Sequence, residues 1–245
     1  QYWGINSLQL LPDGKYKFEA GKCLPYSGSS LDLGAHLIDM ELLTKNEYAK
    51  ILSTEDIGCL ANLSKPALQD GYVHYEKIIP SNSGGQRVLK KAYNELLKAD
   101  TSEKKQLLKQ IKDFSQENKE WLEPKAIFEA LSTKYGTESI EKWSEIDRNL
   151  YNEKLVSISK RKSVIDGIYK SELGKEIGFF EFKQFLAQDH LAKAKNELNQ
   201  KGIKLNGDVV VGFSLDEVWA NPKAFIEGYS IGWGLPAMDF DSPEA

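Results

Sequence analysis

The chain has 245 residues, of which 41% are hydrophobic and 28% are charged, a composition typical of a globular protein with one sizeable core. Its formal net charge of −4 offers no general attraction to nucleic acid or to an acidic membrane surface, so we expect neither as a partner. No apolar run in the sequence approaches the length of a bilayer-spanning helix.

The cysteines indicate the cellular compartment of the protein, and the first residues indicate whether the chain is a fragment. Cys23 and Cys59 form neither a disulfide framework nor a metal-spaced cluster, which favours a reducing cytoplasm. The start, QYWGINSLQLL, has no methionine and lacks the basic and apolar stretches of a signal peptide. Because it alternates like a strand from residue 2, we expect the natural polypeptide to begin earlier and interpret the chain as a fragment.

The first predicted element is a strand over Tyr2–Leu11, which the turn signal PDGKY follows. A long polar and glycine-rich loop then leads to CLPYSGSSLDLGAHLIDMELL. A loop of this length in a compact protein is usually either functional or unfolded.

From about Lys45 the sequence becomes rich in lysine and glutamate, with apolar residues at helical spacing. Two stretches, SEKKQLLKQIKDFSQENKEWL and EPKAIFEALSTKYG, each keep these residues on about one face, and the second ends on Gly136, a suitable C-terminal cap. The stripes predict helices that pack on a core rather than a cofactor site. The predicted core positions are Leu107, Leu108, Ile111, Phe114, Trp121, Ile127, Phe128 and Leu131.

A longer helix is predicted over Ser171–Gln200, and Gly202 stands where it would end. The next stretch, IKLNGDVVVGF, is a short β-branched run that is apolar on both faces, which is typical of a parallel strand entered from a crossover helix. The predicted fold class is therefore α/β with a large helical insertion. The core positions expected on the long helix are Ile177, Phe180, Phe182, Phe185, Leu186 and Leu191.

Asp208 lies within this predicted strand, directly before three valines. Burying a carboxylate costs several kcal/mol unless it is paired or hydrogen-bonded. Ligands of α/β proteins gather at the carboxyl ends of parallel strands, so residues on and just beyond 203–213 are the first candidates for function. The pattern alone leaves two interpretations open, an aspartate in a structural network and an active-site carboxylate.

Two aromatic residues in polar loops are further candidates. Tyr26, in LPYSGSS, could stack on a sugar, a nucleobase or a peptide, or it could only anchor its loop. Trp233 lies between glycines in GYSIGWGLPAMDFDSPEA, ahead of Asp239 and Asp241. Such a carboxylate pair invites an acid and base assignment, although acidic residues beside a Ser-Pro turn are common.

Other chemistries find little support in the sequence. SNSGGQRVLKK lacks the spacing and the Lys-Ser/Thr of a phosphate-binding P-loop, so a capped helix start is the better interpretation. His36, His74 and His190 share no metal-binding spacing, and no G-x-S-x-G nucleophile motif occurs. We therefore expect no metal site.

Five stretches, read in order, resemble the amylomaltases, the 4-alpha-glucanotransferases (disproportionating enzymes) of glycoside hydrolase family 77. They are spread over nearly the whole chain, and their order makes chance resemblance improbable. The five stretches are QYWGINSLQLLP, PYSGSSLDLGAHLIDMELL, WLEPKAIFEALSTKYG, GIKLNGDVVVGFSLDEVWANPKAF and GWGLP.

The resemblance implies a partial (β/α)8 TIM barrel of the α-amylase type. Residues 1–44 would supply a barrel strand and a substrate-cleft loop, 45–170 the helical insertion, and 171–245 a barrel helix, a strand and a further cleft loop. It also implies an enzyme that transfers α-1,4-glucan segments between maltodextrins by a retaining mechanism, without a metal or organic cofactor.

The resemblance also implies roles for single residues. Tyr26 matches the tyrosine of the family's S-P-Y loop, Asp208 the aspartate of G-D-x-P-I, and Trp233 the tryptophan of G-Q-x-W-G, and these three are the predicted substrate-binding residues. Trp219 and Asn221, in DEVWANP, match a segment that is structural rather than sugar-contacting.

Several departures from the family pattern qualify this interpretation. The R-I-D-H and A-E-D-L-G stretches, which hold the family's nucleophile and acid/base, do not occur in the 245 residues, so we expect the chain alone to be inactive and to contain no catalytic residue. GDVVVGFS lacks the Pro-Ile of the pattern, and only IEGYSIG separates Phe225 from Trp233. The shortened loop motivates an alternative, a catalytically inactive glucan-binding relative, and a third possibility is that the helical region is a protein-interaction module.

Overall fold

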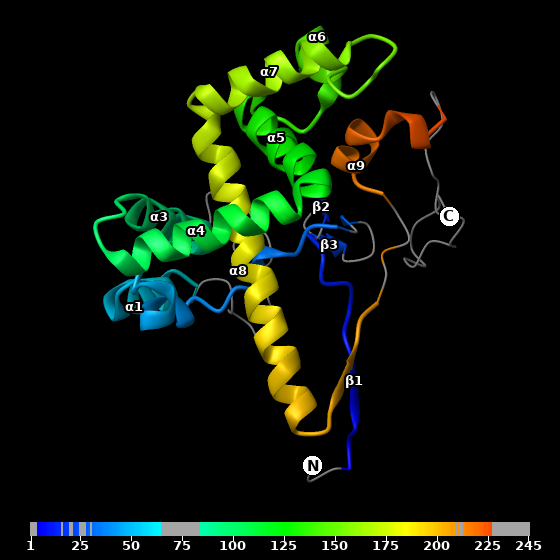
Figure 1. The fold of residues 1–245 in the computed structure, drawn as a ribbon. Helices are drawn as coiled ribbons and strands as arrows, with labels where there is room; N and C mark the ends of the chain where they lie inside the picture. Colours follow the sequence, from blue (N-terminus) through cyan, green and yellow to red (C-terminus); the bar gives the residue numbers. More distant parts are fainter. Residues whose placement is uncertain are drawn as a thin grey trace.

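The computed structural model describes residues 4–15, 17–19, 22–24, 28, 29, 31–64, 84–208, 210 and 213–226. Figure 1 shows a largely helical molecule built around one long helix, α8. The strands are β1 (Ser7–Gln9), β2 (Lys17–Glu19), β3 (Lys22–Leu24) and β4 (Lys204–Asn206). The α-helices are α1 (Thr54–Ser64), α3 (Gly84–Leu97), α4 (Ser102–Glu117), α5 (Lys119–Tyr135), α6 (Glu145–Arg148), α7 (Ile158–Lys170), α8 (Leu173–Gln200) and α9 (Leu215–Ala220). Short 3-10 turns are η2 (Ala35–Leu37), η3 (Leu42–Thr44), η4 (Asn46–Tyr48), η6 (Ile140–Lys142) and η7 (Pro222–Ala224).

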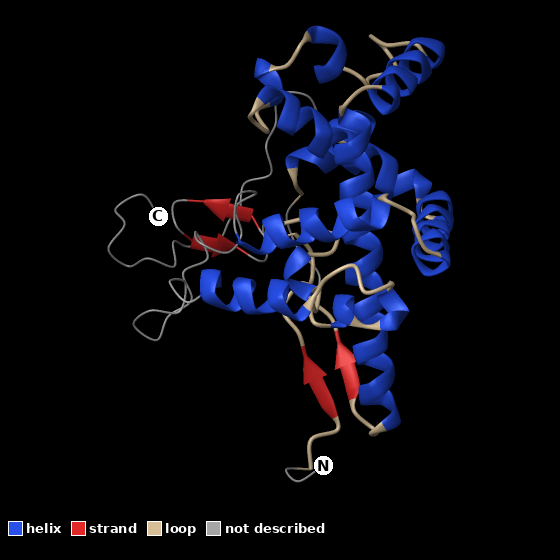
Figure 2. Ribbon diagram, turned by 90° about the vertical axis from the view of Figure 1, so that its left-hand side faces the viewer, coloured by secondary structure: helices blue, strands red, loops and turns tan. Residues whose placement is uncertain are grey.

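The first strand and the strand after α8 form a parallel pair. Leu8 lies opposite Leu205, and Figure 2 shows β1 and β4 as neighbouring arrows that point the same way. This confirms the predicted parallel strand entered from a crossover helix. Both strands are shorter than the sequence predicts, since the observed pairing covers three residues of each within predicted runs of 2–11 and 203–213.

The second strand pair lies where the sequence predicts only a loop. β2 and β3 form an antiparallel hairpin in which Phe18 lies opposite Cys23. The loop prediction is wrong for these residues, because strands of three residues are too short to give a recognisable alternation.

Helix α8 runs down most of the molecule in Figure 1, with α1 and α3 on its left and α5 and β1 on its right. It confirms the predicted long helix. Ile177, Phe180 and Leu186 are buried on it, whereas Leu191 is only half-buried. Gly202 ends the helix with a positive φ of 74°, and the following N–H of Ile203 donates to the carbonyl of Leu198 at 2.9 Å.

The two predicted helical stretches of the insertion correspond to α4 and α5. The first predicted stretch does not form one helix, because α4 ends and α5 begins at Asn118. The side-chain amide of Asn118 donates to the carbonyl of Phe114 at 2.9 Å. Helix α5 ends as predicted on Gly136, which has a left-handed φ of 65°. The core positions Ile111, Phe128 and Leu131 are buried, as expected from their helical spacing.

No helix in the described residues is long and apolar enough to cross a membrane.

The buried side chains form two clusters, and both contain residues of α8. The first joins the segment around Ile38 and Leu43 to α3, α4 and the middle of α8 around Phe182. The second joins α5, α7 and the first turns of α8 to Trp219 of α9. The first cluster includes residues on both sides of the predicted boundaries at 44/45 and 170/171, and the second includes residues on both sides of 170/171. The helical region therefore packs together with the flanking segments.

Candidate substrate site

The carboxyl ends of β1 and β4 lie next to each other. Beyond the paired residues, the N–H of Leu10 donates to the carbonyl of Asn206 at 2.8 Å. Gln9 Nε2 donates to the carbonyl of Gly207 at 3.1 Å, although 198 positions separate the two residues. These bonds keep together the segments that leave the two strands. In parallel α/β sheets ligands bind beyond the carboxyl ends of the strands, so this is the candidate site.

Asp208 lies two residues beyond the end of β4 and is exposed. The prediction that it lies inside a buried strand is therefore wrong. The ladder to β1 stops at Asn206, and the exposed Gly207 precedes Asp208, so this carboxylate does not carry the desolvation cost of a buried charge. An exposed carboxylate at a strand end can accept hydrogen bonds from a bound ligand.

The other two predicted substrate-binding residues lie outside the described part of the chain. Tyr26 falls between β3 and Gly28, and Trp233 follows the last described residue, Ile226. Of the three, the structure therefore describes Asp208 alone. That all three line one glucan cleft remains a prediction.

The loop after Tyr26 is fastened to the segment after β1. The N–H of Ser29 donates to the carbonyl of Lys15, and the N–H of Lys15 donates to the carbonyl of Asp32, both at 3.1 Å. Gly14 makes this close approach possible, because a Cβ at that position would lie 2.1 Å from the carbonyl oxygen of Ser29. The backbone of the loop is thus fixed against the strand that leads to the candidate site.

A buried lysine joins this loop to two helices. Lys125 of α5 has a side chain that is 3% exposed, and its Nζ lies 3.0 Å from Asp32 Oδ1 and 2.5 Å from Asp216 Oδ2. It also donates to the hydroxyl of Ser29 and lies 3.5 Å from Glu217 Oε1. Removing one partner of such a buried charge pair costs on the order of 3–5 kcal/mol. We call these five residues the Lys125 cluster.

The carboxyl groups of the cluster respond differently to their surroundings. Burial raises the pKa of Asp32, although Lys125 opposes that rise. Burial also acts against ionisation of Asp216, but the attraction and hydrogen bond of Lys125, together with a hydrogen bond from Ser214, outweigh it and lower the pKa of Asp216. Lys125 remains charged, because Asp32 and Asp216 outweigh its burial and raise its pKa. One ammonium group thus faces three carboxyls, of which Asp32 has its protonated form favoured by burial.

Helix α9, which follows the candidate site, starts in this cluster. Glu217 accepts a hydrogen bond from the backbone N–H of Ser214 through Oε2 at 3.1 Å, the reciprocal half of a capping box. Its other oxygen, Oε1, accepts a hydrogen bond from the Ser29 hydroxyl at 3.2 Å. The same carboxylate therefore caps the helix and contacts the loop after Tyr26.

Sequence reasoning missed the Lys125 cluster, although α5 carries one signal. Lys125 is three residues from both Leu122 and Phe128, so it shares a helix face with two apolar residues that are buried. A lysine on a buried stripe needs carboxylate partners, but the sequence does not indicate which ones.

Trp219 of DEVWANP has the structural position expected for it. Trp219 is 4% exposed and donates through Nε1 to the carbonyl of Asp147 at 3.1 Å. Its ring packs on those of Phe128 and Tyr151, with centroids 5.5 and 4.9 Å away. The amide of Asn221 donates to the carbonyl of Glu217 at 3.1 Å and so closes the end of α9.

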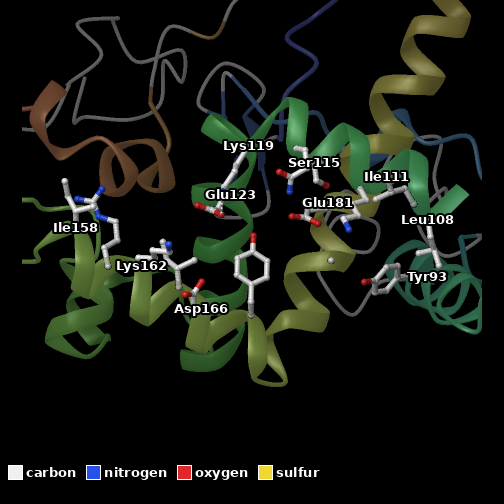
Figure 3. Close-up of a pocket in the computed structure, with 16 residues that line it drawn as sticks. Tyr93, Leu108, Ile111, Ser115, Lys119, Glu123, Ile158, Lys162, Asp166 and Glu181 are labelled. Carbon is white, nitrogen blue, oxygen red and sulfur yellow. Dashed lines mark ion pairs between the residues drawn. The ribbon is translucent and has the colours of Figure 1, made fainter. Parts of the chain in front are cut away.

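A cavity of about 700 Å³ lies elsewhere, among α3, α4, α5, α7 and α8 (Figure 3). Its walls combine Glu123, Asp166 and Glu181 with Lys119 and Lys162. Among the described residues, those that line it include none of β1, β4 or the loops that follow these strands, so we treat it apart from the candidate site.

In the described residues no three His, Cys, Asp or Glu side chains are arranged to hold a metal ion. His190 has a structural position instead, because its Nδ1 accepts a hydrogen bond from the N–H of Asp39 at 3.0 Å and its ring meets that of Tyr48 edge-on at 5.1 Å. Burial lowers the pKa of His190, in keeping with a neutral acceptor.

The parallel strand pair, the crossover helix and the polar strand ends define an α/β protein with a large helical region. The family model described as 4-alpha-glucanotransferase matches residues 1–243. The chain belongs to this family, glycoside hydrolase family 77, which confirms the resemblance found in the sequence.

Individual relatives agree with this assignment. A 4-alpha-glucanotransferase of Clostridium butyricum is 26% identical over 229 residues, covering 92% of this chain and 40% of that protein. The chloroplastic/amyloplastic 4-alpha-glucanotransferase of Solanum tuberosum is 29% identical over 222 residues, covering 89% of this chain and 34% of that protein. The structure of amylomaltase from Streptococcus agalactiae in complex with acarbose aligns with a TM-score of 0.68 and 26% identity, over 90% of this chain and 39% of that one. The chain thus spans 34–40% of the length of these relatives.

Proposed function

We propose that the chain is part of a 4-alpha-glucanotransferase that transfers α-1,4-glucan segments between maltodextrins. The observation that carries the proposal is the parallel pairing of β1 with β4, which brings the segment leading to the Tyr26 loop beside the segment that carries Asp208. The family match over residues 1–243 supports the same activity. The expected substrate is a maltooligosaccharide or a longer α-1,4-glucan.

The proposed mechanism is retaining. A carboxylate attacks the anomeric carbon and forms a glycosyl-enzyme, while an acid protonates the oxygen of the leaving glucan. The hydroxyl of an acceptor sugar, in place of water, then takes the glycosyl group. The nucleophile and the acid/base belong to the R-I-D-H and A-E-D-L-G stretches, which do not occur in these 245 residues. The contribution of this chain is therefore to bind and orient the glucan.

In this proposal β1 and β4 are adjacent strands of a partial (β/α)8 barrel. Residues 1–44 supply a strand and a cleft loop, 45–170 the helical insertion, and 171–245 a helix, a strand and a further cleft loop. Support comes from the parallel pair, whose two strands are joined through the whole helical region, and from the likeness to the amylomaltase structure.

Three side chains are proposed to contact the glucan. Tyr26 and Trp233 would stack on sugar faces, and Asp208 would accept hydrogen bonds from sugar hydroxyls. The exposure of Asp208 beyond the end of β4 supports its assignment. A cytoplasmic location is part of the same proposal, supported by the free and exposed thiol of Cys59.

The activity is tested by incubating the complete gene product that contains this chain with maltotriose. We expect glucose and maltodextrins longer than maltotriose to appear together, because each transfer releases one product and lengthens another. Cellotriose, which has β-1,4 linkages, is the matched control and should remain unchanged. Maltotriose that stays intact, or is only hydrolysed to shorter sugars, would contradict the proposal.

The second candidate function is a catalytically inactive relative that only binds glucan. The specific observation behind it is the short segment IEGYSIG between Phe225 and Trp233. This candidate predicts maltotriose binding without any products, and a gene that lacks the R-I-D-H and A-E-D-L-G stretches. Sequencing the gene beyond Ala245 distinguishes the two candidates.

The packing of the described residues disfavours the third possibility, a separate interaction module at 45–170. Its helices share their buried clusters with Ile38, Phe182 and Trp219, which lie outside that range. We expect circular dichroism of excised residues 45–170 to show a poorly ordered chain. A stable helical monomer would support the module instead.

A further inference from the structure

The Lys125 cluster connects three segments that are distant in sequence. Ser29 and Asp32 belong to the loop after Tyr26, Asp216 and Glu217 begin α9, and Lys125 comes from the insertion helix α5, 91–96 residues away from Ser29, Asp32 and Asp216. A lysine ammonium has three donors, and Ser29, Asp32 and Asp216 each accept from it. One buried group thus fixes both cleft segments to the insertion.

The buried ammonium group of Lys125 strongly constrains the position of the loop after Tyr26. Asp32 is 2% exposed and Ser29 is 2% exposed, so neither can exchange the lysine for water without opening the loop. Gln184 of α8 holds the next residue, Leu33. Its Nε2 donates to the carbonyl of Leu33 at 3.1 Å, and its Oε1 accepts from the N–H of Leu33 at 2.9 Å. The loop after Tyr26 therefore takes its position from the helical region as well as from β1.

The charges around the cluster do not supply a substitute cation directly. Lys15 pairs with Glu129 of α5 and lies 3.4 Å from Glu138, so its charge is already shared between two carboxylates. Lys183 of α8 also faces Glu129, and burial lowers its pKa. Among the described residues, Asp32 and Asp216 form ion pairs with Lys125 alone, and Lys15 attracts them only from a distance.

We propose that Lys125 is a positioning residue for the glucan cleft: it holds the loop that follows Tyr26 and the helix that follows Asp208 in one arrangement, so that substrate binding depends on a buried side chain of the insertion. This rests on the proposed glucanotransferase function. Lys125 does not contact the sugar, and it acts only through the two segments that it joins.

The first test measures hydrogen–deuterium exchange of the complete gene product in the absence of sugar. Lys125→Met removes the charge but keeps most of the length of the side chain, and we expect faster exchange in residues 28–34 and 214–220. Lys125→Arg should restore part of the protection. The control is Lys119→Met on the same helix, where the side chain is 58% exposed, and it should leave both segments unchanged.

The second test measures kcat and KM for maltotriose from about pH 8 to about pH 5.5. In Lys125→Met the carboxyls of Asp32 and Asp216 lose the ammonium group that lies between them. At high pH both are ionised and repel one another, whereas protonation at low pH relieves this repulsion. At about pH 8 we expect the KM of Lys125→Met to rise about tenfold or more, with a smaller change in kcat. At about pH 5.5 its KM should approach the wild-type value. Adding Asp32→Asn to Lys125→Met should recover part of the loss at high pH.

The outcomes are separable. Unchanged exchange in residues 28–34 of a folded Lys125→Met variant overturns the positioning role, and so does a KM effect that is the same at every pH. If wild-type protein does not convert maltotriose, the proposed function fails, while the exchange comparison still decides whether Lys125 fixes the loop. Should Lys125→Met not fold, Asp32→Asn alone provides the comparison, because it is expected to loosen residues 28–34 but not α9.

Discussion

Trp219 donates a hydrogen bond through its indole N–H to the carbonyl of Asp147 at 3.1 Å, across 72 residues of sequence. The bond joins α9, which follows the candidate site, to α6 in the helical region. Because both groups are buried, the position of α9 depends on packing in the second core cluster.

Replacing Trp219 by phenylalanine should lower the free energy of unfolding by about 2–3 kcal/mol, because a buried carbonyl loses its donor and a smaller ring leaves space. Urea denaturation monitored by circular dichroism measures this. The control is Trp121→Phe, where the indole is half-buried and donates to the side chain of Asn118, and its cost should be clearly smaller. Equal costs for both variants would contradict a special role of Trp219 in the core.

Two glycines should respond to alanine in opposite directions. Gly136 has a left-handed φ of 65° at the end of α5, so Gly136→Ala should destabilise the fold by about 1 kcal/mol. Gly167 lies within α7 with open space around its Cα, so Gly167→Ala should stabilise it by about 0.5–1 kcal/mol. Thermal unfolding of both variants measures the two changes in Tm. A shift of Tm in the same direction for both variants would contradict the prediction.

Stability should fall in acid partly through Asp147. Burial acts against its ionisation, but hydrogen bonds from Lys134 and the Tyr135 hydroxyl, both at 2.7 Å, outweigh burial and lower its pKa. A carboxyl with a lowered folded-state pKa stabilises the fold above its unfolded-state pKa, and this contribution is lost as the pH falls through the folded-state pKa.

Asp147→Asn should therefore lose less unfolding free energy than wild type between about pH 6 and about pH 2.5, and urea titrations at both values measure the difference. Asp113→Asn serves as the control, because Asp113 is 53% exposed and pairs with Lys109 on the surface. An acid dependence of Asp147→Asn identical to that of wild type would argue against this account.

Asp208→Asn separates binding from stability. Because Asp208 is exposed, the substitution should change the unfolding free energy by no more than about 0.5 kcal/mol. If the carboxylate accepts hydrogen bonds from sugar hydroxyls, maltotriose should bind more weakly by about 1–2 kcal/mol, as measured by calorimetry. Asp166→Asn on α7, also exposed, should bind normally. Normal binding by both variants would remove Asp208 from the site.

Tyr26→Ala and Trp233→Ala should each weaken maltotriose binding by roughly 1–3 kcal/mol, the scale of one lost aromatic contact. Both residues lie outside the described part of the chain, so binding measurements on the complete gene product are the direct test. Tyr169→Ala on α7, a partly exposed tyrosine remote from the strand ends, is the control. Unchanged affinity in both variants would reject the sugar-site assignment.

Local sequence patterns predicted α4, α5 and α8, but they indicated no separate helix at α1 or α7. The spacing around Ile111, Phe128 and Leu186 identified buried faces, and Gly136 and Gly202 marked the helix ends. The same patterns misplaced Asp208 inside a strand and missed the hairpin of β2 and β3. Both errors concern strand length, which depends on how many residues find a partner in another segment rather than on the run of apolar residues.

The sequence by itself determined the helical faces, their caps, the parallel entry into β4 and the family, because each depends on neighbours within a few residues or on short ordered motifs. Tertiary structure alone decided which carboxylates surround Lys125 and that the loop after Tyr26 meets α9. Ser29 and Glu217 are 188 positions apart, and only the closed fold, which excludes water from that junction, makes one lysine the common partner of both segments.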